Sequence, residues 1–489
     1  MILEPPKSDY GVLKLFINGK WVESSSSEYV DVYDPGLGKV IAKVPMATEA
    51  EIDEAVEAAY EAFKSWSKLP VPDRLQYIFK MKYLMEENKE IIARANTQNH
   101  GKVIRESRGD LRRSIENIEA AISIAYTLAK GEYQQEIARG VDEVLIREPL
   151  GVFAVISPYN FPVMIPFWFI PYALALGDTL VVKVSPITPL PMVLVMEVLA
   201  SELPPGVLNI VHGDHIGEHL VTHPLVEGTA FVGTSNVALR LYELSASKGK
   251  RFLGGGSAAN YAVVMPDAEL ERTVPNIRDS KFGNTGQRCL AIQNIVLVGD
   301  IYDKFKESFL NLVKEIRIGY GLDERSEMGP MASKKYRDNV IRMIEEGLRE
   351  GAKLALDMRE VRVEGYPNGF YLGPTVLEDV TPDMKIAREE IFGPVANLMR
   401  ADSLDQAIEW INKNKYHHSA SIFTKSGKYA REFLHNVYVG NVGINIGIAA
   451  PVGWFPFGGK RLAGLGSHHP QMDVVDFFTD RKIGIVRWF

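Results

Sequence analysis

Cysteine is almost absent from this sequence, since Cys289 is the one cysteine among 489 residues. A single cysteine excludes an internal disulfide framework and any cysteine-rich metal site. Cys289 is therefore either a buried spectator or a nucleophile. Composition alone favours the spectator, because a free cysteine packs well as a small hydrophobic side chain.

An excess of positive charge is also lacking. The formal net charge is −7, so the chain has no basic field of the kind that attracts nucleic acid. No uncharged apolar stretch reaches the length of about 18 residues that a membrane-spanning helix needs. The first residues lack the basic start and apolar core of a signal peptide. We therefore expect a cytoplasmic protein with neither nucleic acid nor membrane as a partner.

Phosphate-binding signatures of the GxGxxG and GxxxxGK[ST] types are missing as well, so nucleotide binding has to be argued from topology. Hydrophobic residues make up 46% and charged residues 24% of the chain, as in ordinary globular proteins. At 489 residues the chain is too long for a single hydrophobic core. This length predicts two large domains.

Short β-branched runs that alternate with helix-like segments begin after Gly151. The first set comprises residues 152–157, 179–185, 207–211 and 229–234. Continuous apolar strands of this kind predict an open parallel sheet covered on both faces. Ligands of such sheets bind beyond the carboxyl ends of the strands. We therefore expect one crevice lined by residues 157–160, 183–186 and 233–235.

A second set of strand-like runs follows the glycine run 254–256, which we interpret as a hinge between domains. These runs, at 260–265, 294–299, 419–424 and 441–446, predict a second α/β domain. The N-terminal quarter is expected to be helical. Thr48 and Glu51 have the spacing of a capping box, and apolar residues then recur at helical spacing at Ile52, Ala55, Val56, Ala59 and Phe63.

Cys289 follows Gly283-Asn284-Thr285-Gly286-Gln287-Arg288, a small and flexible run that ends in a cation. A neighbouring guanidinium favours the thiolate, which is the nucleophilic form of cysteine. This context favours the nucleophile over the spectator.

The sequence resembles the aldehyde dehydrogenase superfamily over almost its whole length. The resemblance rests on motifs in the order that this family has: FINGKW (16–21), REPLGV (147–152), SPYNFP (157–162), VVKVSP (181–186), FVGTS (231–235), LGG (253–255), GQRC (286–289), EEIFGP (389–394) and FPFGG (455–459). Within the superfamily the chain is most similar to the methylmalonate-semialdehyde dehydrogenase branch. The run GINIGIAAPVGWFPFGG, Arg288 before the cysteine, and Arg113 carry that similarity.

The resemblance implies an α/β fold of three parts. These are an open-sheet nicotinamide cofactor domain (1–129 and 148–255), an α/β catalytic domain (256–467) and a small oligomerisation element (130–147 and 468–489). The last part implies a homodimer or a homotetramer.

The resemblance also implies a reaction and its residues. Cys289 would attack the aldehyde carbon, and Asn160, with the Cys289 N–H, would stabilise the oxyanion. The implied residues for NADP or NAD are Ser157, Lys183, Ser185, Gly213, Gly233, Thr234, Leu253, Glu390 and Phe392. The implied substrate residues are Phe161, Arg113, Arg288 and Phe455, and two arginines would suit a substrate carboxylate. For Arg113, a solvated helix face is an open alternative.

Two departures from the family pattern bear on this reaction. The family's general base is a glutamate before Leu-Gly-Gly, and this chain has Phe252 there, which cannot take a proton. NAD-preferring members carry a glutamate at the position of Pro186. Its absence permits the 2′-phosphate of NADP, so we expect NADP to be favoured.

The leading prediction is therefore NAD(P)-dependent oxidation of an aldehyde to its acid through a thiohemiacetal and a thioester on Cys289. The missing base keeps a second enzyme open, a semialdehyde dehydrogenase that transfers the acyl group to coenzyme A. A structural or binding homologue without turnover is a third reading, and retention of Cys289, Asn160 and Glu390 argues against it. His212, His215 and His219 invite a metal site, but a strand end followed by a solvated helix turn explains them more simply, so no metal is predicted.

Overall fold

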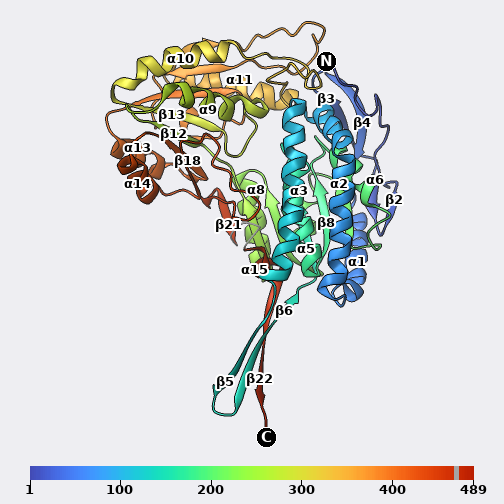
Figure 1. Cartoon of the computed structure of the whole chain (residues 1–489). Coiled ribbons are helices and arrows are strands. Elements are labelled where there is room, and N and C mark those ends of the chain that lie inside the picture. The colour runs from blue at the N-terminus through green and yellow to red at the C-terminus, as the bar shows by residue number, and fades with distance from the viewer. Residues whose placement is uncertain (467–472) are drawn as a thin grey trace.

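The computed structural model describes residues 1–466 and 473–489. Its first sheet has eight strands in the order β2-β1-β9-β8-β7-β10-β11-β21 (Figure 1). The five strands at its centre are parallel. Four of them match the β-branched runs of the sequence, and the fifth includes Gly254 and Gly255 of the run predicted to be a hinge. The five strands are β9 (Leu208–His212), β8 (Thr179–Val184), β7 (Val152–Ile156), β10 (Val226–Val232) and β11 (Arg251–Gly255).

Antiparallel strands close both edges of this sheet. β1 (Leu15–Ile17) and β2 (Lys20–Val22) add to one edge, and β21 (Gly464–Gly466) pairs with β11 at the other. Residues 464–466 therefore belong to the first sheet, although the expected boundary assigned them to the catalytic domain. Pairing covers an edge that would otherwise expose unpaired N–H and C=O groups.

Helices cover both faces of the first sheet. The buried side chains of β7 alternate between the two clusters that form on these faces. Phe153 and Val155 pack with α2 (Val71–His100), α3 (Ile104–Thr127) and α5 (Ile170–Leu176). Val152 and Ala154 pack instead with α1 (Glu49–Trp66). The predicted capping box of Thr48 and Glu51 is present at the start of α1. The remaining elements of this part are β3 (Tyr29–Asp34), β4 (Lys39–Pro45), α4 (Met164–Phe167), α6 (Leu190–Leu199), α7 (Gly217–Thr222) and α8 (Ser235–Ser247).

The second sheet confirms the second α/β unit. Its order is β14-β15-β16-β13-β12-β18-β19, and only β14 (Lys353–Asp357) runs antiparallel to its neighbour. The parallel strands are β15 (Thr375–Glu378), β16 (Val395–Ala401), β13 (Ile292–Val298), β12 (Asn260–Val264), β18 (Ser419–Phe423) and β19 (Asn441–Ile444). One face packs on α9 (Leu270–Phe282) and α10 (Tyr302–Lys314), and the other on α11 (Lys334–Arg349), α13 (Leu404–Lys413) and α14 (Gly427–Asn436).

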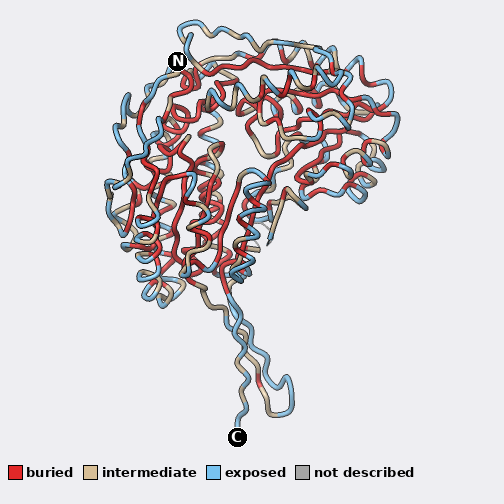
Figure 2. Tube along the Cα trace, turned by 180° about the vertical axis from the view of Figure 1, so that it is seen from behind, coloured by how far each residue is buried: buried red, intermediate tan, exposed pale blue. Residues whose placement is uncertain are grey.

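A three-stranded arm extends away from both sheets (Figures 1 and 2). It consists of β5 (Glu132–Ala138), β6 (Val141–Pro149) and β22 (Thr479–Arg487), with β6 in the middle. The arm covers most of the predicted oligomerisation element, of which residues 468–472 lie outside the described residues. Several of its apolar side chains are exposed, namely Ile137, Ile146, Ile483 and Ile485.

Three chain segments line one cavity. The first follows β7, the second contains Cys289 and follows the turn η1 (Gly283–Gly286), and the third precedes β16. No helix in the described part of the chain is long and apolar enough to cross a membrane.

Candidate active site

The turn before Cys289 is held in an unusual backbone conformation. Asn284 and Thr285 have positive φ angles of 51° and 54°, and Gly286 has 74°. A side chain at Gly286 would clash with the carbonyl group of Gly393. Thr285 is held because its hydroxyl donates to the Gly329 carbonyl at 2.9 Å. Surrounding contacts must stabilise such a conformation, so the position of the cysteine is tightly determined.

Asn160 and Cys289 lie together, as predicted. The Asn160 side-chain amide donates to the Gln287 carbonyl at 3.0 Å and lies 3.9 Å from Cys289 Sγ. Asn260, at the start of β12, donates to the Cys289 carbonyl at 2.7 Å. Its role was missed because nothing in the sequence links it to the cysteine.

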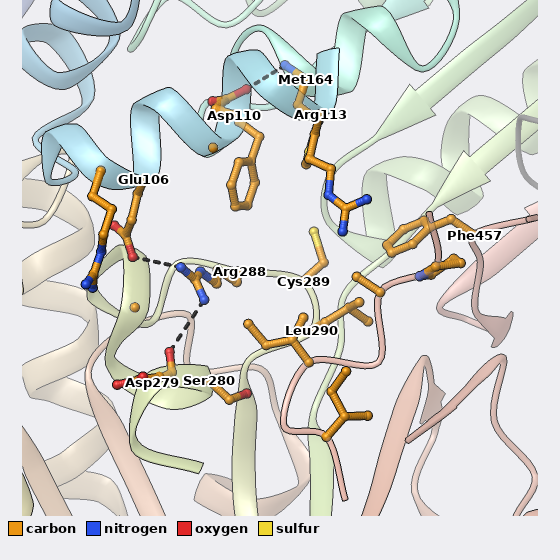
Figure 3. Close-up of a pocket in the computed structure, with 18 of the residues that line it drawn as sticks. Glu106, Asp110, Arg113, Met164, Asp279, Ser280, Arg288, Cys289, Leu290 and Phe457 are labelled. Carbon is orange, nitrogen blue, oxygen red and sulfur yellow. Dashed lines mark hydrogen bonds and ion pairs between the residues drawn. The ribbon is translucent and has the colours of Figure 1, made fainter. Parts of the chain in front are cut away.

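Cys289 lines two cavities, of which the first has a volume of about 610 Å³. Figure 3 shows Cys289 at its centre, between Glu106 and Arg288 on one side and Arg113 and Phe457 on the other. Its apolar wall includes Phe161, Met164, Trp168, Leu290, Ile448 and Phe457. The predicted Phe455 is not among the lining residues and is 62% exposed. Phe457, two residues further on, takes that place.

Both predicted substrate arginines line the first cavity, but each already has a carboxylate partner. Arg288 Nη2 lies 2.7 Å from Glu106 Oε1 (Figure 3). Arg113 Nη1 contacts both carboxylate oxygens of Glu116 at 2.9 Å. The expectation that Arg288 favours the Cys289 thiolate is therefore wrong, because its guanidinium turns towards Glu106.

Electrostatics keep Cys289 in the thiol form in the free enzyme. Desolvation, followed by the charge of Glu390, raises the pKa of Cys289 to about 12. A thiol of this kind attacks a carbonyl only after a base has taken its proton.

Glu390 has the properties of such a base. Desolvation raises the pKa of Glu390 to about 7, against hydrogen bonds from the Ala258 N–H and Ser257. Its charge acts on the pKa of Cys289, so the two groups are electrostatically coupled. A carboxyl group that titrates near neutral pH is suited to proton transfer.

Lys281 is a charged group at the site that the sequence analysis missed. It lies in α9 and is 1% exposed, and its ammonium makes no hydrogen bond or ion pair to another described residue. Desolvation lowers the pKa of Lys281 to about 7, against the opposing charge of Glu390. A signal exists in the sequence, because Lys281 continues the buried stripe of Val274 and Ile277.

The second cavity, of about 1230 Å³, brings together seven of the nine predicted cofactor residues. These are Ser157, Lys183, Ser185, Gly233, Thr234, Glu390 and Phe392. Gly213 does not line it, and Leu253 lies fully buried in the core of the first sheet.

The second cavity fits a nicotinamide dinucleotide. Thr234 is the N-cap of α8 and makes no side-chain capping bond, so its side chain leaves amides of the first turn to a pyrophosphate. Phe392 has a φ of 54°, and its ring meets Tyr159 edge-on at 6.0 Å. A strained non-glycine residue beside a cavity is typical of ligand sites.

The end of this cavity near Lys183 carries both signs of charge. Lys183 Nζ lies 3.4 Å from Asp214 Oδ1, and desolvation lowers the pKa of Lys183. Pro186 does not line the cavity, whereas Ser185 does.

Phe252, at the position of the family's glutamate, does not line either cavity. It is the second residue of β11, is 3% exposed and packs on Tyr242 with the rings 5.6 Å apart. The carboxyl end of β11 consists of Gly254 and Gly255, followed by Gly256. Neither Phe252 nor these glycines can accept a proton.

The three histidines do not converge. His212 is fully buried, and His219 Nε2 pairs with Asp53 Oδ1 at 2.6 Å. Across residues 1–466 and 473–489 no group of three or more His, Cys, Asp or Glu side chains could hold a metal.

Comparison with known proteins places this site in a family. The model of the aldehyde dehydrogenase family matches residues 21–483. The chain belongs to the aldehyde dehydrogenase family. This aldehyde dehydrogenase is 41% identical over 480 residues to malonate-semialdehyde dehydrogenase 1 of Geobacillus thermodenitrificans, covering 97% of this chain and 99% of the relative.

Solved structures agree with this membership. A putative methylmalonate-semialdehyde dehydrogenase from Sinorhizobium meliloti 1021, complexed with NAD, has a TM-score of 0.96 at 33% identity, covering 98% of both chains. An NADP-dependent enzyme from E. coli has a TM-score of 0.93 at 27% identity, covering 99% of this chain and 100% of the other. The predicted fold, family and oxidoreductase class are confirmed, as is the similarity to the methylmalonate-semialdehyde branch.

Proposed function

We propose that this aldehyde dehydrogenase oxidises an uncharged, hydroxylated aldehyde to its carboxylic acid. The pairing of both cavity arginines with glutamates carries this choice of substrate. A carboxylated substrate would have to displace Glu106 or Glu116 and leave a charge unpaired, which is costly in a partly buried site. Glu106, Glu116 and Asp279 line the first cavity, and their carboxylates are potential acceptors for substrate hydroxyls.

The reaction begins on Cys289. Glu390 takes the thiol proton, and Sγ bonds to the aldehyde carbon. The carbonyl oxygen becomes an alkoxide that accepts hydrogen bonds from the Asn160 amide and the Cys289 N–H. The nicotinamide cofactor, when bound in the second cavity, supplies the hydride acceptor. As the carbon loses its hydride, the C=O bond forms again and leaves a thioester on Cys289.

Water is the acyl acceptor that we favour. Its addition to the thioester, with breakage of the C–S bond and return of a proton to sulfur, gives the acid and frees Cys289. Because neither Phe252 nor the glycines at the end of β11 can accept a proton, Glu390 is the base that this proposal assigns to water activation, after it has released the thiol proton to solvent. It then passes the proton taken from water to the departing sulfur. Transfer to coenzyme A is the second candidate, and the same glycines favour it because a thiol needs less activation than water.

For the cofactor we propose that NADP is used at least as well as NAD. The support is the absence of a carboxylate at Pro186 together with Ser185 and Lys183 in the second cavity. Asp214 opposes this choice through its ion pair with Lys183, but it is 75% exposed and free to turn into solvent.

We also propose that the chain assembles as a homodimer or homotetramer in the cytoplasm. Exposed strand edges and apolar side chains on the arm support pairing with a second copy. Measurement of the molar mass in solution tests this proposal.

The substrate proposal is tested by comparing kcat/KM for glyceraldehyde with that for malonate semialdehyde. We expect glyceraldehyde to be preferred by the native enzyme. Glu106→Gln releases Arg288, so it should raise kcat/KM for malonate semialdehyde by about 10–100-fold, the worth of one charge-assisted hydrogen bond. Glyceraldehyde oxidation should change by less than about threefold, because the glutamine side chain keeps an oxygen that accepts a hydroxyl hydrogen bond.

Glu327→Gln is the matched control, because Glu327 lines the same cavity but pairs with Arg317. It should leave the preference unchanged. A native enzyme that prefers malonate semialdehyde would contradict the proposed substrate. To separate the acceptors, thioester decay on Cys289 is followed in a single turnover. If the thioester decays only when coenzyme A is present, coenzyme A rather than water is the acyl acceptor.

A further inference from the structure

A fully buried ion pair lies behind the oxyanion asparagine. Lys102 and Asp110 are both 0% exposed in their side chains, and Lys102 Nζ lies 3.2 Å from Asp110 Oδ2. Lys102 follows Gly101, the C-cap of α2, and Asp110 lies in α3. Taking two charges out of water costs several kcal/mol per ion in general, and a well-packed apolar pair is often as stable. Stability alone therefore gives no reason for an ion pair here.

The remaining contacts of Lys102 go to the segment that carries Asn160. Its ammonium donates to the Asn160 carbonyl oxygen at 2.6 Å and stands 4.2 Å from the centre of the Phe161 ring. The same amine thus contacts the backbone of the oxyanion residue and the face of an aromatic side chain that lines the first cavity.

Asp110 binds the other end of this segment. Its Oδ1 accepts the Met164 N–H at 2.7 Å (Figure 3), and its Oδ2 also accepts from the Asn96 side chain at 2.8 Å. The ion pair is therefore hydrogen-bonded to residues 160–164 at both ends. All these groups are buried or partly buried, so solvent competes little with the contacts.

We propose that Lys102 and Asp110 are positioning residues, which fix the Asn160 amide beside Cys289 and the Phe161 ring in the first cavity. The inference rests on the proposed function, in which the Asn160 amide stabilises the oxyanion. A donor of this kind is effective only if it is already in place when charge develops on the substrate oxygen. Asn284 adds a weaker contact, since its side chain donates to the Asn160 carbonyl at 3.3 Å.

The test is a double-mutant cycle between Lys102 and Asn160. Removal of the donor in Asn160→Ala should lower kcat by about 10²–10³-fold. Lys102→Met should lower kcat by about 10–100-fold with the cofactor KM unchanged, because the donor is misplaced rather than lost. In the Asn160→Ala background, Lys102→Met should lower kcat by less than about twofold, since its effect on kcat passes through the missing amide. Any loss through the Phe161 ring, which lines the first cavity, should appear in the KM for the aldehyde instead. If the losses in kcat of the two single variants multiply in the double variant, the proposal is overturned.

Separate variants distinguish a loss of folding stability from a loss of positioning. Lys102→Met leaves Asp110 buried and unpaired, so its melting temperature should fall. The apolar pair Lys102→Met with Asp110→Leu should recover most of that stability while kcat stays low, because neither end of the segment is held. Recovery of kcat together with stability would show a structural role only. Lys306→Met, which breaks the Lys306–Glu378 pair outside both cavities, should leave kcat unchanged.

Failure of the proposed function gives a different result. If Asn160→Ala keeps native kcat, the oxyanion role falls, and with it the role of the pair. If Asn160→Ala loses activity but Lys102→Met does not, the reaction stands and the positioning role is refuted.

Discussion

Glu390 provides the sharpest test of the mechanism, because its pKa determines the acid limb of the plot of kcat/KM against pH. Desolvation raises the pKa of Glu390 to about 7, and only the carboxylate form can take the Cys289 proton. A group with that pKa is about one-eleventh ionised at pH 6 and about ten-elevenths ionised at pH 8. We therefore expect kcat/KM to rise about tenfold between these values and then to level off.

The variant Glu390→Gln removes the base and keeps the shape of the side chain. The limb should disappear, and kcat should fall by about 10²–10⁴-fold, as for loss of a general base. Initial rates are measured from the absorbance of the reduced cofactor, and cofactor binding is measured separately to account for any lost ribose contact.

Glu389→Gln is the matched control for this variant. Glu389 is the preceding residue, but its carboxylate binds Lys415 and Tyr416 and does not line either cavity. It should keep the native limb. If Glu390→Gln retains a limb with the same midpoint, another group is the base and the assignment of Glu390 is refuted.

Three further predictions concern single side chains. Cys289→Ser should abolish turnover and keep cofactor binding, because a serine alkoxide is far harder to form than a thiolate; appreciable turnover would remove the covalent mechanism. Asp214→Asn should lower the KM for NADP about 3–10-fold and that for NAD less, since it removes charge that repels the 2′-phosphate; an equal change for both would exclude Asp214 from cofactor choice. Lys281→Met should stabilise the fold in thermal melts at about pH 7, because burial lowers the pKa of Lys281 to about 7 and disfavours its charged form. Between this pKa and the pKa of a lysine in the unfolded chain, the unfolded state of the native protein holds a proton that the folded state lacks. The stability of the native protein should therefore rise with pH in this range, and the difference in stability between the variant and the native protein should narrow. A difference that widens with pH would contradict this.

The parallel strands and the capped first helix could be predicted because their signals are local. Apolar runs such as 152–157 encode buried strands, and Thr48 with Glu51 encodes a helix start within one turn. β21 could not be predicted in this way, because Gly464–Gly466 has no strand signal of its own. It pairs with β11, more than 200 residues earlier in the chain.

The site shows the same limit. Motif order was sufficient to place Asn160 beside Cys289 and to collect most of the cofactor residues in one cavity. The electrostatics were not predictable from neighbours in sequence. Arg288 precedes Cys289 directly, yet its guanidinium pairs with Glu106, 182 residues away, and the pKa of Cys289 is raised by desolvation and Glu390 instead.

The preference of the first cavity for charged or uncharged substrates does not follow from the relatives alone. An identity of 41% over 480 residues establishes the fold and the reaction class, but the preference of a cavity for charge depends on a few contacts within it. An arginine recognises a carboxylate when its guanidinium is free to donate a bidentate pair. Here one guanidinium nitrogen of each arginine already contacts a glutamate, Arg288 Nη2 on Glu106 and Arg113 Nη1 on Glu116. Under the proposed function, the two arginines lose their role in carboxylate recognition because Glu106 and Glu116 of α3 pair with them. The arginines alone would instead predict a carboxylated substrate, and the comparison of glyceraldehyde with malonate semialdehyde decides between the two.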